Sequence, residues 1–251
     1  MILRNWLAHP LTRGLDLNDP HTTELRREVI HSKPFLERIY REWYAWIASQ
    51  LPAVEGNVLE LGAGAGFLGE YIPGLITSEV FVCRGAAAVL DGQQMPFCAA
   101  SLRAVVFTDV LHHLPEVRRF FKEAARCVRP GGRVIMVEPW VSGWSRFIYP
   151  RLHHERFDPE AEWEFPTSGP ISGSNQALPW IIFQRDREIF VREFPQWRIL
   201  ALRPGMALRY LVSGGLSTRS LMPAWTYSLW VQAERLSHLG GMFVFIVLER
   251  K

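Results

Sequence analysis

Residues 58–66 read Val-Leu-Glu-Leu-Gly-Ala-Gly-Ala-Gly, and this stretch decides the fold. Its apolar residues favour the end of a buried strand. A turn with glycine at every second position follows, at Gly62, Gly64 and Gly66. Because glycine has no Cβ, such a turn lets a ligand approach the main chain closely. Glu60, just before the turn, would repel a phosphate group and attract an ammonium group.

A glycine turn of this kind has two interpretations. The dinucleotide-binding pattern is Gly-x-Gly-x-x-Gly, in which a pyrophosphate rests on a helix N-terminus. Its third glycine would stand at position 67, where this sequence has Phe67. Phe67 and Glu60 together disfavour a nicotinamide oxidoreductase. The second pattern, Glu-x-Gly-x-Gly-x-Gly, places the acid opposite the amino group of a cofactor that carries an amino acid.

Three more segments follow the glycine turn in order. Residues 91–97 read Asp-Gly-Gln-Gln-Met-Pro-Phe, and residues 104–115 read Ala-Val-Val-Phe-Thr-Asp-Val-Leu-His-His-Leu-Pro. Residues 123–138 read Glu-Ala-Ala-Arg-Cys-Val-Arg-Pro-Gly-Gly-Arg-Val-Ile-Met-Val-Glu, which suits a helix, a turn and a buried strand. With the glycine turn, these segments resemble the class I S-adenosylmethionine-dependent methyltransferases, in particular the type 11 methyltransferases, over about residues 54–140.

The resemblance implies an α/β fold of the Rossmann-like kind. Its sheet would have seven strands, mostly parallel with an antiparallel last strand, and helices and loops would form a cap. Only eleven residues separate Glu79 from Asp91, too few for a parallel crossover with a full helix. We therefore expect a shortened crossover between the second and third strands, which could leave the adenine pocket more open on one side.

The resemblance also implies which residues hold S-adenosylmethionine. Glu60 would anchor its amino group and Glu79 its two ribose hydroxyls. Asp91 and Gln93 would orient the adenine, and residues 109–113 would line the methionine and methyl end. The complete expected set is Glu60, Gly62, Ala63, Gly64, Gly66, Glu79, Asp91, Gly92, Gln93, Asp109, Val110 and His113.

Methyl transfer from a sulfonium is a one-step displacement, so the protein mainly aligns the reactants and excludes water. A general base helps only where the acceptor must lose a proton. Histidine is favoured for that task because its ordinary pKa of ~6.5 lies near working pH. The expected catalytic candidates are His113, His153 and His154, with His112, Glu138 and Tyr149 as further candidates. No third ligand stands at a diagnostic spacing from the pair at 153–154, so no metal site is expected.

The chain divides into an N-terminal helical cap, residues 1–52, and a methyltransferase-like domain, residues 53–251, in which residues 139–173 form an inserted substrate lid. Apolar residues recur every three or four positions after Ser32, which predicts an amphipathic helix with Ser32 as its N-cap. Other predicted helices span 66–72, 115–128, 174–194 and 220–238. Predicted strands span 57–61, 104–108, 133–138, 196–203 and 242–249, with a bend through 206–212 extending the sixth.

The predicted lid is rich in aromatic side chains: Trp140, Trp144, Phe147, Tyr149 and Phe157. They suit either an apolar, flat substrate or packing within the cap. We expect methyl transfer to a small-molecule or lipid-like acceptor. A non-catalytic S-adenosylmethionine-binding partner protein is the alternative, and the shortened crossover motivates it. The sequence does not indicate an oligomeric state.

Composition argues against several other classes of protein. The 251 residues fit one α/β domain with additions, and 48% are apolar, enough for a core. The basic residues are dispersed among acids, so nucleic-acid binding is not expected despite a net charge of +3. No apolar run reaches the ~18–20 residues of a membrane span, and no signal peptide is recognisable. We therefore expect a cytoplasmic protein without a transmembrane segment.

Overall fold

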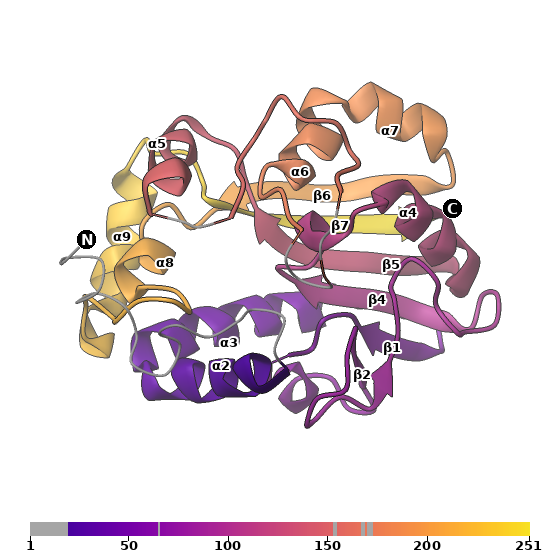
Figure 1. Cartoon of the computed structure of the whole chain (residues 1–251), viewed down its shortest axis with the longest axis horizontal. Coiled ribbons are helices and arrows are strands. Elements are labelled where there is room, and N and C mark those ends of the chain that lie inside the picture. Colours follow the sequence, from indigo (N-terminus) through magenta and orange to yellow (C-terminus); the bar gives the residue numbers. More distant parts are fainter. Residues whose placement is uncertain (1–19, 65, 153–154, 167–168, 170–172) are drawn as a thin grey trace.

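Figure 1 shows the computed structural model of the chain, which describes residues 20–64, 66–152, 155–166, 169 and 173–251. Over these residues, seven strands form one sheet in the order β3-β2-β1-β4-β5-β7-β6. The strands are β1 (Asn57–Glu60), β2 (Ile76–Glu79), β3 (Ala88–Val89), β4 (Leu102–Thr108), β5 (Val128–Pro139), β6 (Trp197–Gly205) and β7 (Phe243–Arg250). Strands β1 to β5 pair in parallel, and β7 pairs antiparallel with β5 and β6. The expected Rossmann-like sheet is confirmed.

Helices cover both faces of the sheet (Figure 1). One face packs against α4 (Val117–Cys127), α6 (Leu178–Trp180), the π-helical turn η4 (Ile181–Arg185) and α7 (Arg187–Glu193). The other packs against α2 (Pro20–Ser32), α3 (Pro34–Ser49), α5 (Gly143–Leu152), α8 (Arg209–Ser213) and α9 (Tyr227–Leu236). Strand β4 belongs to both layers, because alternate side chains of a strand point to opposite faces. Phe107 joins the first cluster and Val106 the second.

Helix α3 forms where the amphipathic pattern predicts it, but Ser32 does not cap it. Helix α2 ends at Ser32, whose hydroxyl donates a hydrogen bond of 2.9 Å to the Val29 carbonyl. Lys33 precedes α3, and Pro34 occupies its first turn. Proline is favoured there because it has no amide hydrogen to leave unpaired and its φ already suits a helix.

The predicted helix at 66–72 is wrong. The structure has only the short 3₁₀ turn η2 (Leu68–Glu70) at this place. Pro73 and Gly74 end the segment, and Gly74 has a φ of +73°. A helix confined between Gly66 and Pro73 is too short to repay its nucleation. Buried Phe67 and Leu68 hold the turn against the sheet instead.

The shortened crossover between β2 and β3 is confirmed. The connection at 80–87, all of it described, contains no helix, and β3 has two residues. The hydroxyl of Thr77 donates to the Gly85 carbonyl at 3.0 Å, and the Ala87 amide donates to the Thr77 carbonyl at 2.9 Å. These bonds fold the chain directly back beside β2.

Two predictions near the C-terminus need correction. Residues 206–212 do not extend the sixth strand, because α8 begins at Arg209. The carboxylate of Glu234 in α9 accepts hydrogen bonds of 2.7 Å from the amides of Leu208 and Arg209, which fixes that helix start. The helix predicted at 220–238 is the turn η5 (Ala224–Thr226) followed by α9. Within the described ranges, no helix has the length and apolar character to cross a membrane.

Candidate functional site

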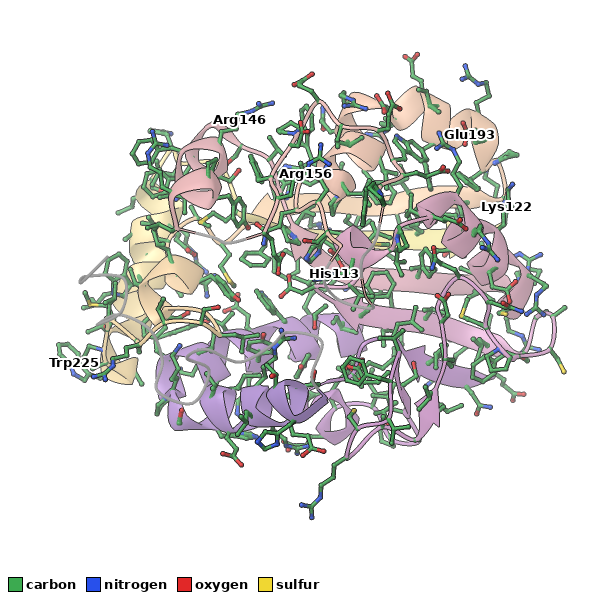
Figure 2. All side chains as sticks on the ribbon, in the orientation of Figure 1. His113, Lys122, Arg146, Arg156, Glu193 and Trp225 are labelled. Carbon is green, nitrogen blue, oxygen red and sulfur yellow. The ribbon has the colours of Figure 1, made fainter. Side chains whose placement is uncertain are left out.

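The predicted site residues gather at the edge of the sheet where parallel strands end. Glu60 ends β1, Glu79 ends β2, Asp109 follows β4, and Glu138 lies near the end of β5. In open α/β sheets this edge carries the ligand site. Figure 2 labels His113, which follows β4 in the turn η3 (Leu111–His113) at this edge.

The carboxylate of Glu79 links the glycine turn to β2. The amide of Gly64 donates a hydrogen bond of 2.6 Å to Oε1 of Glu79. The amide of Ala63 donates to the Ser78 carbonyl at 2.9 Å. Gly62 and Gly64 have φ values of +60° and +40°, in the left-handed region that other residues rarely adopt. Glycine is therefore required at both positions by backbone conformation.

Side chains of the protein fill the space beside these glycines. A Cβ added at Gly62 would lie 2.6 Å from Cγ2 of Val110, and one at Gly66 would lie 2.7 Å from the hydroxyl oxygen of Tyr44. At Gly64 the nearest atom is Oε1 of Glu79, at 3.1 Å. The turn is thus not bare on the side where a Cβ would point. Packing within the chain accounts for glycine at 62 and 66, so the glycines alone do not identify a ligand.

The acids beside the turn are the stronger indication of a ligand. Burial raises the pKa of Glu60 to about 8, and the charge of Glu79 adds to the rise. Burial raises the pKa of Asp109 to about 7 and also raises the pKa of Glu79. Arg26 of α2 opposes the rise at Asp109 and Glu79. Three carboxylates held in low-dielectric surroundings favour a cation, which would restore their charged forms.

The loop after β3 lies beside the glycine turn. A Cβ at buried Gly92 would lie 3.1 Å from Cδ1 of Leu61. The exposed carboxylate of Asp91 accepts a hydrogen bond of 2.8 Å from the Gln93 amide. The side-chain oxygen of Gln93 in turn accepts 2.9 Å from the Glu116 amide, just before α4. Asp91 is therefore held in place with an open side toward solvent.

The side chain of Glu138 holds the turn η3 in place by hydrogen bonds. Its Oε1 accepts hydrogen bonds of 2.8 Å from the amides of Val110 and Leu111, and its Oε2 lies 2.8 Å from Nδ1 of His112. Glu138 is fully buried, which suits a positioning role. Burial alone would lower the pKa of His112, but the carboxylates of Glu138 and Glu155 outweigh it and raise that pKa to about 10.

Of His113, His153 and His154, only His113 lies within the described residues. Its Nδ1 lies 3.4 Å from the Gly173 carbonyl oxygen. Burial, with the charge on His112, lowers the pKa of His113 to about 3. The sequence did not indicate Glu155 as a neighbour of these rings, because nothing in the variable region after β5 marks its position.

The aromatic residues of the predicted lid mostly pack inside the protein. Trp140 and Tyr149 are buried, and the Tyr149 hydroxyl donates 2.9 Å to the Met242 carbonyl. Trp144 donates its indole N–H to the Ala207 carbonyl at 2.8 Å. Phe147 is 51% exposed and stacks on Trp144. Packing within the cap therefore explains most of this aromatic content.

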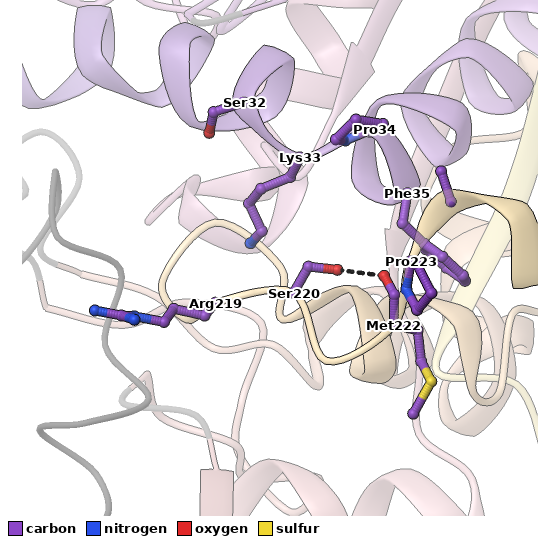
Figure 3. Close-up of a pocket in the computed structure, with 9 residues that line it drawn as sticks. Ser32, Lys33, Pro34, Phe35, Arg219, Ser220, Met222 and Pro223 are labelled. Carbon is purple, nitrogen blue, oxygen red and sulfur yellow. Dashed lines mark hydrogen bonds between the residues drawn. The ribbon is translucent and has the colours of Figure 1, made fainter.

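A separate pocket of about 480 Å³ lies where α2 meets α3 (Figure 3). The amine of Lys33 points into the facing loop and donates to the carbonyls of Gly215 and Thr218, the second at 2.6 Å. Burial lowers the pKa of Lys33 to about 8. None of the predicted site residues lines this pocket. Lys33 therefore links α2 and α3 to the loop that contains Gly215 and Thr218, at a place separate from Glu60, Glu79 and Asp109.

Comparison with protein families gives one match. Residues 59–136 match the family model described as a methyltransferase domain. The match runs from β1 into β5 and so covers the glycine turn, the loop after β3 and the turn η3. No curated protein matches the chain.

Solved structures share the fold at low sequence identity. Geranyl diphosphate C-methyltransferase from Streptomyces coelicolor A3(2), in complex with Mg²⁺, geranyl diphosphate and S-adenosyl-L-homocysteine, is 14% identical, with 98% of this chain and 92% of that chain covered and a TM-score of 0.53. Geranyl diphosphate methyltransferase in complex with SAM gives 14% identity, 98% coverage of both chains and a TM-score of 0.53. A chain of the complex between the Haloferax volcanii Trm112 methyltransferase activator and a protein assigned as a methyltransferase is 13% identical, with coverages of 94% and 98% and a TM-score of 0.54. These similarities show a common fold.

Proposed function

We propose that this chain, whose residues 59–136 form a methyltransferase domain of the class I S-adenosylmethionine-dependent family, transfers a methyl group from S-adenosylmethionine to a small-molecule or lipid-like acceptor. The observation that carries the proposal is the cluster of Glu60, Glu79 and Asp109 at the strand ends. S-adenosylmethionine carries a sulfonium, an ammonium and a carboxylate, so its net positive charge suits three carboxylates whose pKa values burial raises.

We propose one partner in the protein for each part of the cofactor. Glu60 would accept the ammonium group, and Glu79 would accept the two ribose hydroxyls. Asp91, exposed beside the turn, would accept from the adenine amino group. Residues 109–113 would line the methionine and methyl end. Glu79 now holds the Gly64 amide, so the proposal requires its carboxylate to turn from that amide toward the ribose.

The protein's part in the reaction is mainly alignment and exclusion of water. We propose that the segment 139–173, which includes α5, covers the acceptor side. A base is needed only for an acceptor that loses a proton, and His113, His153 and His154 remain the candidates. The lowered pKa of His113 makes its ring neutral and a weak proton acceptor near neutral pH. His113 would therefore contribute little as a general base.

Exposed apolar side chains in η5 and α9 support the proposal of a lipid-like acceptor. Trp225, labelled in Figure 2, is 77% exposed, and Leu229 and Leu236 are 64% and 81% exposed. Trp225 lies in η5, and Leu229 and Leu236 lie in α9. Large apolar side chains exposed together fit contact with an apolar molecule.

A non-catalytic S-adenosylmethionine-binding protein is the alternative. The side chains packed beside the glycines and the shortened crossover favour it over an ordinary member of the family. The two proposals differ in turnover. The purified protein would be incubated with methyl-labelled S-adenosylmethionine and small-molecule or lipid extracts. Label appearing in an acceptor together with S-adenosylhomocysteine supports the enzyme. Tight binding without turnover in any extract supports the alternative, and no binding contradicts both.

A further inference from the structure

Two adjacent histidines and a glutamate converge beside the turn η3. Ligand atoms of His112, His113 and Glu155 all lie within 4.8 Å of one another. We infer that these three residues form a binding site for a divalent transition-metal ion. The inference goes beyond methyl transfer and does not depend on it, and it departs from the sequence-based expectation that no metal is bound.

The ring orientations favour a metal site. Nδ1 of His112 lies 2.8 Å from Oε2 of Glu138, and Nδ1 of His113 lies 3.4 Å from the Gly173 carbonyl oxygen. Each acceptor favours a proton on Nδ1, so that Nε2 could bind a metal ion in place of a second proton. Histidines that bind metals in proteins usually donate their other ring N–H to a carboxylate or a main-chain carbonyl in this way.

The spacing of one donor pair also fits. Nε2 of His112 lies 3.5 Å from Oε2 of Glu155. Two donors that each lie about 2.1 Å from one tetrahedral ion are about 3.4 Å apart. The side-chain amide Nε2 of Gln176 donates a hydrogen bond of 2.9 Å to the same Glu155 oxygen and so orients the carboxylate.

The three ligand side chains indicate which class of metal ion the site would bind. Two imidazole nitrogens and one carboxylate suit Zn²⁺, Co²⁺ or Fe²⁺, whereas Mg²⁺ and Ca²⁺ prefer sites built from oxygen ligands. Three protein ligands leave at least one position for water or for an oxygen of a bound molecule. The site adjoins the glycine turn, because Val110, two residues before His112, packs beside Gly62. An exchangeable ligand there would face the predicted cofactor region.

Cobalt is the best probe, because Co²⁺ absorbs visible light in a way that reports nitrogen and oxygen ligands. The full chain would be stripped with a chelator, dialysed against CoCl₂ or ZnCl₂, and assayed for bound metal by mass spectrometry. We expect about one Co²⁺ per chain, a visible absorption band, and a rise in Tm with Zn²⁺. Glu155→Gln and His113→Asn should each bind Co²⁺ at least tenfold more weakly, with loss of the band.

Matched control variants are Glu164→Gln, on the same segment, and His21→Asn, both at exposed positions. They should keep the full Co²⁺ content and the band. His113 and Glu155 are only half-buried, and circular dichroism of their variants checks that they fold. Wild-type protein without stoichiometric Co²⁺ and without a Zn²⁺-dependent Tm would overturn the inference, as would folded variants that bind Co²⁺ normally. S-adenosylmethionine binding would be measured on the same samples. Its result tests the proposed function and does not bear on the metal site.

Discussion

Glu79, at the end of β2, accepts a hydrogen bond of 2.6 Å from the main-chain amide of Gly64 in the turn after β1. Its other oxygen lies 3.3 Å from the Val80 amide. The two amides stabilise the charged form of a carboxylate whose pKa burial raises. An acid held at the junction of two strand ends is positioned for a ligand that enters between them.

Glu79→Ala should weaken S-adenosylmethionine binding by about 1.5–3 kcal/mol, roughly tenfold to a hundredfold, because two hydroxyl groups of the ligand lose a charged acceptor. Titration calorimetry measures the change. Glu70→Ala is the control, since Glu70 is an exposed acid on the neighbouring turn η2. Equal affinity in the Glu79 variant and the control would show that the ribose does not meet this acid.

The affinity for S-adenosylhomocysteine should rise with pH between about 5.5 and 7.5. The pKa of Glu60 is about 8, so below that value the free protein carries the protonated acid. The ammonium group of the ligand favours the carboxylate, so binding must expel a proton, at a cost that shrinks as pH rises. The limiting slope is about tenfold in affinity per pH unit. Glu60→Gln should make the profile shallower, because only Asp109 and Glu79 would still titrate, and an unchanged slope in that variant would contradict the assignment.

The ligand-free protein should become less stable as pH rises from about 5 to 8. Over this range the native state keeps a proton on Glu60, whose pKa is raised from 4.5 to about 8, while the unfolded chain has lost it. Stability falls with pH wherever the native state binds more protons, by up to about 1.4 kcal/mol per unit for one group. Asp109 acts in the same direction. Denaturant titrations at several pH values should show a shallower fall in Glu60→Gln and an unchanged fall in the exposed Glu188→Gln.

Gly62→Ala should lower the free energy of unfolding by about 2–4 kcal/mol, through left-handed backbone strain and overlap with Val110. Adding Val110→Ala should recover the overlap part but not the strain. Gly69→Ala is the matched control, because nothing lies within 4 Å of its Cβ position. Chemical denaturation measures all four proteins. A double variant no more stable than Gly62→Ala would show that Val110 is not the obstacle.

Much of the sheet could be predicted because its strands are buried on both faces and read as apolar runs, as residues 104–107 do. The order of the motifs gave the positions of Glu60, Glu79 and Asp109 at the strand ends. The spacing between Glu79 and Asp91 correctly predicted the short crossover. Local patterns and fixed distances along the chain are sufficient for such features.

Features that depend on distant partners could not be predicted. Helix α8 begins where Glu234, far along the chain, accepts two amides, and no pattern at 206–212 reveals that. The pairing of His112 with Glu138 joins residues 26 positions apart. The helix expected at 66–72 is a different case, because the adjacent Pro73, visible in the sequence, leaves too little length for a stable helix.

A crystal structure of the protein with S-adenosylmethionine tests the central claim most directly. We predict the ligand at the carboxyl ends of β1 and β2, with its ammonium group on Glu60 and with the Glu79 carboxylate turned from the Gly64 amide onto the ribose. A ligand seated elsewhere, for example in the pocket beside Lys33, with Glu79 still bonded to Gly64, would contradict it.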